Sequence, residues 1–127
     1  MESILIIEDN AEIRENAMEL LQLEGYNVYA AADGIRGLQL ANDNLPHLII
    51  SDVMMPGMNG HQIFEALKEN PLTRHIPFVF LTSSVENSEI ALALDKGAAG
   101  YIKKPFDDKE LFETIKQCLS CKKSSLF

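Results

Sequence analysis

The residues of this chain best suited to chemistry are acids, a hydroxyl and a lysine that stand directly after short apolar runs. Glu8 and Asp9 follow "ILII", Asp52 follows "LIIS", Thr82 follows "FVFL", and Lys104 follows "GYIK". Like charges about 4 Å apart repel by about 4 kcal/mol at an effective dielectric constant of about 20. Three carboxylates gathered in one place therefore require a cation among them.

A hard divalent ion fits this set of residue types. Mg²⁺ is commonly held by one or two carboxylates, waters and a phosphate oxygen. Lys104 adds a positive charge, and Thr82 adds a hydroxyl. Taken singly, an acid or hydroxyl after a strand is often only the N-cap of the next helix. Their joint occurrence after four apolar runs favours a phosphoryl site with a carboxylate at its centre.

The elements that must position these residues alternate along the chain. Apolar runs of strand length alternate with segments of helical period. The first helical segment, "NAEIRENAMELLQLEG", is closed by Gly25 in the C′ position. The predicted strands cover residues 4–7, 28–31, 48–51, 78–81 and 100–102, and the remaining predicted helices cover residues 33–42, 59–70, 86–96 and 107–119.

This alternation predicts an α/β fold made of five strand-helix units. The strands read as nearly continuous Ile, Leu, Val and Phe, which is typical of a parallel sheet buried on both faces by helices. In such doubly wound sheets the functional site lies beyond the carboxyl ends of the strands. We predict one domain over residues 1–120 and a tail over residues 121–127, with no room for an output domain. We expect either a stand-alone domain or one portion of a longer protein.

The composition limits the classes of partner that the chain is expected to bind directly. The chain has 127 residues and a formal charge of -8, which argues against direct binding of nucleic acid or of an anionic membrane. Its start resembles neither a signal peptide nor a membrane span, so we expect a cytoplasmic protein. Cys118 and Cys121 form a lone Cys-x-x-Cys pair. We interpret them as reduced thiols at a helix end, rather than as a redox pair or half of a metal site.

Four motifs give the chain a family resemblance. In order they are "IIEDN", "SDVMMPGMNG", "FLTSS" and "GYIKKPF", and together they resemble the receiver domain of two-component response regulators. The resemblance covers about residues 3–119. It implies a (βα)5 flavodoxin-like fold, a doubly wound parallel five-stranded sheet with strand order 2-1-3-4-5, which agrees with the strand-helix pattern read independently.

The resemblance also implies roles for the acidic residues. Asp52 matches the phospho-acceptor, and Glu8 with Asp9 matches the acidic pair that helps to bind Mg²⁺ (or Mn²⁺). Asp9 is the expected direct ligand of the pair, and Asp52 and the backbone carbonyl of Met54 are expected to be further ligands. Because a methionine side chain cannot orient a water molecule by hydrogen bonding, Met54 predicts a long-lived phosphoryl group.

Further positions match the family's switching machinery. Lys104, directly before Pro105, matches the lysine that contacts the phosphoryl group, and the bond between the two is expected to be cis. Lys103 is then a surface residue. Thr82 matches the switch hydroxyl, and Tyr101 matches the aromatic residue that rotates inward on activation.

The resemblance implies partners rather than an enzymatic substrate. The phosphodonor would be a sensor histidine kinase or a histidine phosphotransfer protein. A downstream effector protein would bind the face built by the fourth helix, the fifth strand and the fifth helix. The chain would catalyse only its own phosphorylation and dephosphorylation. A homodimer through the same face is left open, and so are the cognate kinase and the target.

Three other functions fit parts of the pattern. An aspartyl-phosphate phosphatase uses a similar carboxylate but needs a second acid at the position of Met54. A flavodoxin-like electron carrier shares the strand order, but "EDNAE" would repel its cofactor phosphate. A receiver-like scaffold that is never phosphorylated is the third, and the complete set of matching residues argues against it.

Overall fold

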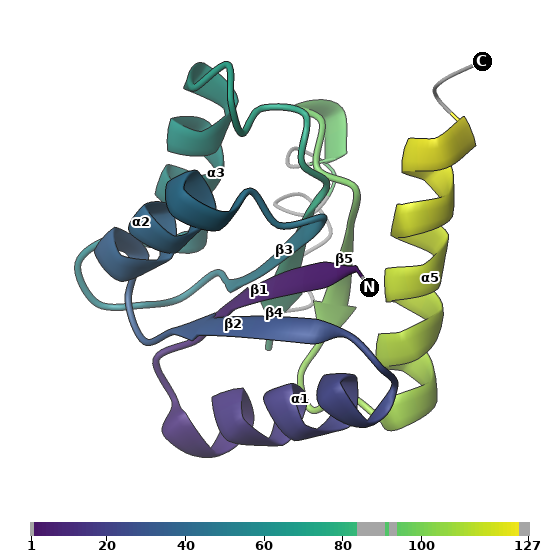
Figure 1. Cartoon of the computed structure of the whole chain (residues 1–127). Helices are drawn as coiled ribbons and strands as arrows, with labels where there is room; N and C mark the ends of the chain where they lie inside the picture. Colours follow the sequence, from purple (N-terminus) through teal and green to yellow (C-terminus); the bar gives the residue numbers. More distant parts are fainter. Residues whose placement is uncertain (1, 84–90, 92–93, 125–127) are drawn as a thin grey trace.

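The structure is a computed structural model of the whole chain (Figure 1), and it describes residues 2–83, 91 and 94–124, with backbone only for residues 121–124. The strands are β1 (Ser3–Ile7), β2 (Asn27–Ala31), β3 (Leu48–Asp52), β4 (Phe78–Thr82) and β5 (Gly100–Lys103). The helices are α1 (Ala11–Leu23), α2 (Gly34–Asn44), α3 (Gly60–Glu69) and α5 (Asp108–Ser124).

The five strands form one parallel sheet in the order β2-β1-β3-β4-β5. This confirms the predicted fold class and strand order. The register pairs Ile7 with Ser51 at the ends of β1 and β3. One position further on, Glu8 falls beside Asp52, so the sheet itself brings the first two acidic motifs together.

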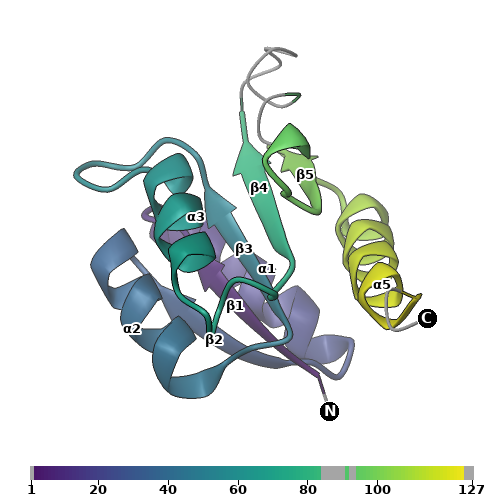
Figure 2. The same ribbon diagram turned by 90° about the horizontal axis from the view of Figure 1, so that it is seen from above.

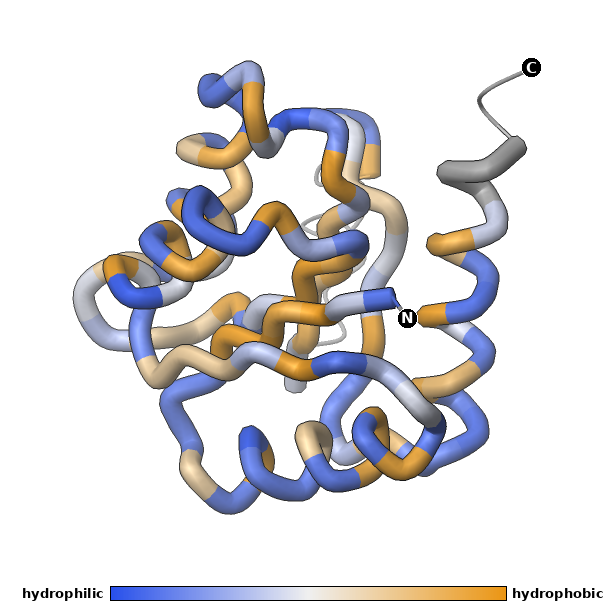
Figure 3. The backbone as a smooth tube through the Cα atoms, viewed as in Figure 1, coloured by the Kyte–Doolittle hydropathy of each residue, from blue (hydrophilic) through white to orange (hydrophobic). Residues whose placement is uncertain are grey.

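Helices cover both faces of this sheet, with α2 and α3 on one side and α1 and α5 on the other (Figure 2). Successive strand side chains point to opposite faces. In β1, Ile4 and Ile6 join the core against α1 and α5, whereas Leu5 and Ile7 join the core against α2 and α3. The central strands are accordingly hydrophobic apart from polar residues at their ends, while the helices alternate between polar and apolar residues (Figure 3).

Side-chain caps define where the helices begin. The side chains of Asn10, Asp33 and Asn59 each accept a hydrogen bond from a backbone N–H in the first turn of α1, α2 and α3. Gly25 follows α1 with a φ of 93°, as predicted for its C′ position. These caps hold the helix starts next to the strand ends that carry the polar residues.

The C-terminal helix is longer than predicted. We expected it over residues 107–119, followed by a loose tail, but α5 continues to Ser124. The added stretch "SCKKS" contains no glycine or proline to end a helix. The rest of the expected tail, and most of the helix predicted over residues 86–96, lie outside the described residues.

Two further expectations concern the cysteines and the membrane. Within α5, Cys118 is buried and its thiol lies 3.9 Å from the carbonyl oxygen of Ala99, while the side chain of Cys121 lies outside the described residues. No helix in the described part is both long and apolar enough to cross a membrane.

Candidate phosphoryl and cation site

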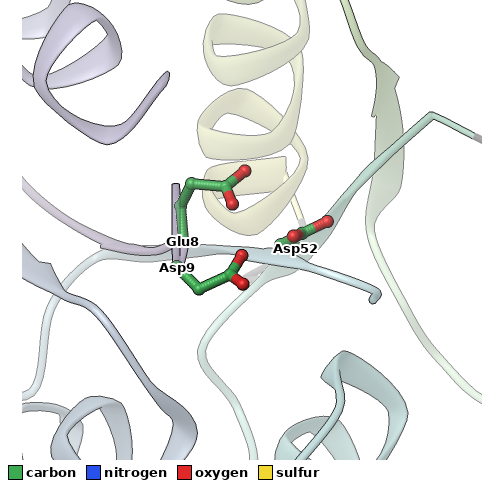
Figure 4. Close-up of side chains that lie close together, drawn as sticks. All are labelled: Glu8, Asp9 and Asp52. Carbon is green, nitrogen blue, oxygen red and sulfur yellow. The ribbon is translucent and has the colours of Figure 1, made fainter. Parts of the chain in front are cut away.

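Three carboxylates gather at the carboxyl ends of β1 and β3 (Figure 4). Ligand oxygens of Glu8, Asp9 and Asp52 all lie within 4.8 Å of one another. Glu8 and Asp52 are buried, and Asp9 is exposed. The structure thus joins acids that stand more than forty positions apart in the sequence.

Lys104 bridges the two buried carboxylates. Its Nζ lies 3.0 Å from Oε1 of Glu8 and 3.1 Å from Oδ1 of Asp52. The backbone N–H of Lys104 donates to the carbonyl oxygen of Thr82 at 2.7 Å, which fixes the lysine to the end of β4. Lys104 therefore connects three strand ends, those of β1 and β3 through its ammonium group and that of β4 through its backbone N–H.

Burial and nearby charges shift the pKa values of Glu8 and Lys104. Burial raises the pKa of Glu8 from 4.5 to about 7, although hydrogen bonds from the Asn10 N–H and from Lys104 act against the rise; the nearby charge of Asp52 adds to it. Burial alone would lower the pKa of Lys104, but its bonds to Glu8 and Asp52 prevail and raise it. The lysine therefore stays charged at neutral pH.

Two contacts around Glu8 were not predicted from the sequence. The backbone N–H of Asn10 donates to Oε2 of Glu8 at 3.2 Å, and the Arg14 guanidinium donates to the main-chain carbonyl oxygen of Glu8 at 2.8 Å. A long cationic side chain one helical turn into α1 is the sequence signal for the second contact, because side chains in helices lean toward the N-terminus.

The turn after Asp52 depends on two glycines. Gly57 has a φ of 79°, in the left-handed region. A Cβ atom on Gly60 would come within 2.5 Å of the Asp52 carbonyl oxygen, and the Gly60 N–H donates to the Val53 carbonyl oxygen at 2.9 Å. The chain therefore doubles back closely against the end of β3, and Met54 is left on the outside with 75% of its surface exposed.

A cleft leads to the site. It has a volume of about 740 Å³, and its lining residues are Glu12, Ile13, Asn16, Ser83, Lys104, Pro105 and Phe106. Only 5% of the Asp52 side chain is exposed. The cleft meets the acidic site at Lys104, whose Nζ lies 3.1 Å from Oδ1 of Asp52.

The expected switch residues occupy distinct positions. Thr82 is buried at the end of β4. Tyr101 on β5 points outward, with 46% of its surface exposed, and lines a second cleft of about 470 Å³ with Thr114 and Cys118. Lys103 is exposed, as predicted, and the Lys104-Pro105 peptide bond is cis, as expected.

The donor set fits a hard divalent cation. All three clustered ligands are carboxylates, which suit Mg²⁺ or Mn²⁺ far better than a soft metal. Both oxygens of Glu8 already accept hydrogen bonds, one from Lys104 and one from Asn10. The exposed carboxylate of Asp9 is the more accessible ligand of the pair.

Fold and site together define a class of protein, a flavodoxin-like α/β domain with a lysine-bridged acidic site at the carboxyl edge of its sheet. A sequence model of the response regulator receiver domain matches residues 4–116. The chain therefore belongs to the receiver domains of two-component response regulators, which are signalling modules.

Known relatives agree with this assignment. The chain is 38% identical over 119 residues to the transcriptional regulatory protein CpxR of Escherichia coli, a match that covers 94% of this chain and 50% of CpxR. It is 44% identical over 117 residues to a histidine kinase of Formosa agariphila, covering 92% of this chain and 8% of the kinase. The chain thus spans half or less of these curated relatives.

A solved structure shows the same fold. The chemotaxis response regulator CheY4 of Vibrio cholerae superposes with a TM-score of 0.87 at 31% identity, covering 93% of this chain and 98% of CheY4. The family assignment excludes the phosphatase and electron-carrier alternatives.

Proposed function

We propose that Asp52 accepts a phosphoryl group from a phosphohistidine on a partner protein. The observation that carries this proposal is the double contact of Lys104 with the buried carboxylates of Asp52 and Glu8. The ammonium group of a lysine held at this point is placed to neutralise oxygens that arrive next to Asp52.

The transfer needs a nucleophile and a positive charge around the phosphoryl oxygens. An Asp52 carboxylate oxygen attacks phosphorus in line, the P–N bond to the donor imidazole breaks, and its electron pair returns to the ring nitrogen. Lys104 moves its ammonium contact from the free carboxylate to a phosphoryl oxygen. A Mg²⁺ ion held by Asp9 and Asp52, beside Glu8 and the carbonyl of Met54, would supply further positive charge.

The acyl phosphate carries a signal through the residues around it. We infer that the Thr82 hydroxyl turns to donate to a phosphoryl oxygen, and that Tyr101 then moves inward from its exposed position on β5. The surface formed by the predicted fourth helix, β5 and α5 changes with it. This is a shift between two populated states rather than a rigid lock.

The partners follow from this chemistry. The curated relatives include response regulators and a histidine kinase, which supports pairing with kinases and effectors in general. We propose a sensor histidine kinase or a histidine phosphotransfer protein as donor, and an effector protein bound at the switching face. A cytoplasmic location is part of this proposal, because donor and acceptor must share a compartment.

The test is phosphorylation in vitro. The wild type, Asp52→Asn and a control are incubated with Mg²⁺ and acetyl phosphate and analysed by intact mass. We expect the wild type to gain one phosphoryl group and Asp52→Asn to gain none. The control, Asp43→Asn, changes an exposed acid on α2 and should behave as the wild type. No gain by the wild type, or equal gain by Asp52→Asn, would refute the proposal.

A further inference from the structure

Arg14 makes a contact that none of the expected roles explains. It lies in the first turns of α1 and is half-buried. Its guanidinium reaches back past the helix start and donates to the main-chain carbonyl oxygen of Glu8 at 2.8 Å. A charged donor makes this a stronger hydrogen bond than one between neutral groups. The contact therefore ties α1 to the loop that carries the acidic pair.

The atom that Arg14 holds belongs to the peptide unit between Glu8 and Asp9. A peptide unit is planar, so fixing its carbonyl also fixes the N–H and the Cα of Asp9. The other side of Glu8 is fixed as well, since its N–H donates to the Ala31 carbonyl oxygen at 3.0 Å. Arg14 thus holds the peptide plane that places the Asp9 Cα, which limits the positions that the Asp9 side chain can take.

Asp9 depends on this support more than its neighbour does. The Glu8 carboxylate is held by Lys104 and by the Asn10 N–H. In the described part of the chain, ion pairs involve Lys96 and Lys104 only, so the Asp9 carboxylate takes part in none. Asp9 is also exposed. Its position next to the other two carboxylates therefore follows from its backbone.

The positive charge of Arg14 is unfavourable for cation binding at the neighbouring acidic cluster. The same three ion pairs, in the described residues, leave its guanidinium without a carboxylate partner. A positive charge near a cation site repels the cation. Arg14 as a charge alone would weaken metal binding, whereas Arg14 as a hydrogen-bond donor would strengthen it by ordering Asp9. The two roles therefore predict opposite changes in Mg²⁺ affinity when Arg14 is replaced.

We propose that Arg14 is a positioning residue, which orients Asp9 for Mg²⁺ through the Glu8 carbonyl. This inference rests on the proposed function, because it assumes that the acidic cluster binds Mg²⁺. Outer contacts that orient a metal ligand are typically worth about 10-fold to 100-fold in metal affinity. A main-chain contact one peptide away from the ligand belongs at the lower end of that range.

The experiment measures Mg²⁺ affinity directly, without phosphorylation. Calorimetric titration with MgCl₂ compares the wild type, Arg14→Met and Arg14→Lys. We expect Arg14→Met, which keeps the aliphatic stem but removes the donor, to bind about tenfold more weakly. Arg14→Lys should recover part of the affinity, because its ammonium can donate to the same carbonyl. The control is Arg74→Met, an exposed arginine between α3 and β4, which should leave affinity unchanged.

A second readout separates positioning from general stability. In metal-free NMR spectra, loss of the hydrogen bond to the Glu8 carbonyl should shift the amide nitrogen of Asp9 in Arg14→Met but not in Arg74→Met. Equal or tighter Mg²⁺ binding by Arg14→Met overturns the inference, and so does an unshifted Asp9 amide.

A variant that fails to fold leaves the inference testable. If Arg14→Met does not fold, Arg14→Lys with wild-type affinity and an unshifted Asp9 amide supports the inference. Arg14→Lys that binds Mg²⁺ no better than an Asp9→Asn control overturns it. A wild type that binds no Mg²⁺ would refute the proposed function instead.

Discussion

Glu8 is the residue whose protonation the fold changes most clearly. Its pKa rises from 4.5 to about 7 because the carboxyl group is buried. Between these two values the folded state holds a proton that the unfolded state has already released. The contribution of Glu8 to stability is therefore fully present below pH 4.5 and is lost as the pH rises through about 7.

The prediction is a metal-free stability that falls as the pH is raised from about 5 to about 7. Its size is at most about 3 kcal/mol, since a tenfold change in proton affinity is worth about 1.4 kcal/mol. Urea unfolding in EDTA, followed by circular dichroism, measures it. Glu8→Gln should flatten the dependence, while Glu15→Gln, on the exposed face of α1, should keep it. If Glu8→Gln and the wild type showed the same pH dependence of stability, Glu8 would not be its source.

Met54 is the residue from which we expect control of the phosphoryl lifetime. Its side chain is 75% exposed and cannot orient water. Met54→Asn adds an amide that can, so phosphorylated Met54→Asn should lose its phosphoryl group about tenfold faster, below the 100-fold or more of a true general base. The control is Met54→Leu, which should match the wild type. The decay is followed by intact mass after the donor is removed, and equal rates would reject the idea.

Part of the site could be predicted from the sequence at this scale. Glu8, Asp9, Asp52 and Lys104 were found because parallel strands present their ends at one edge. The Arg14 contact was not predicted: a cationic residue one turn into α1 is visible in the sequence, but the pattern does not say which atom its flexible guanidinium contacts. Nor could spacing reveal that Lys104 contacts both buried acids at once, which depends on the register of β1 and β3.

The elements were predictable to different degrees. Strand positions followed from unbroken apolar runs, and helix starts followed from capping residues such as Asn59. The predicted end of α5 was wrong, because a polar helix continues where no glycine or proline terminates it. Side-chain caps are local and visible in sequence, whereas the last turns of an amphipathic helix depend on what the rest of the chain leaves exposed.

The approach of α3 to β3 is the element contact on which the site depends most. A Cβ at Gly60 would meet the carbonyl oxygen of Asp52 at 2.5 Å and the Cα of Val53 at 3.0 Å. Both are backbone atoms, so the strand end must move to admit a methyl group.

Gly60→Ala should therefore destabilise the fold by about 2 kcal/mol and slow phosphorylation of Asp52 by displacing it. Urea unfolding and the acetyl phosphate reaction measure the two effects. Glu69→Ala, on the exposed side of α3, is the control and should change neither. Gly60→Ala with wild-type stability and rate would show that the strand end tolerates the shift.

At the scale of the molecule, Lys104 is the point where several elements meet. Its side chain contacts residues at the ends of β1 and β3, and its backbone is bound to the end of β4. It directly follows β5, the strand that carries Tyr101. A charge added at Asp52 can therefore act on β5 through the lysine.

The corresponding prediction is that Lys104→Ala separates phosphorylation from its structural consequence. Acetyl phosphate should still modify Asp52 to some degree, because the carboxylate remains, but the response at Tyr101 and along α5 should be lost. Unpaired buried carboxylates are destabilising, so the measurement is made with Mg²⁺ present and on the fraction that is phosphorylated.

The control is Lys103→Ala, which removes an exposed lysine next to it. NMR spectra before and after phosphorylation should show shifts across β5 and α5 in the wild type and Lys103→Ala, but only near Asp52 in Lys104→Ala. Identical shifts in phosphorylated wild type and phosphorylated Lys104→Ala would mean that the signal leaves the site by another route, with Thr82 on β4 as the next residue to test.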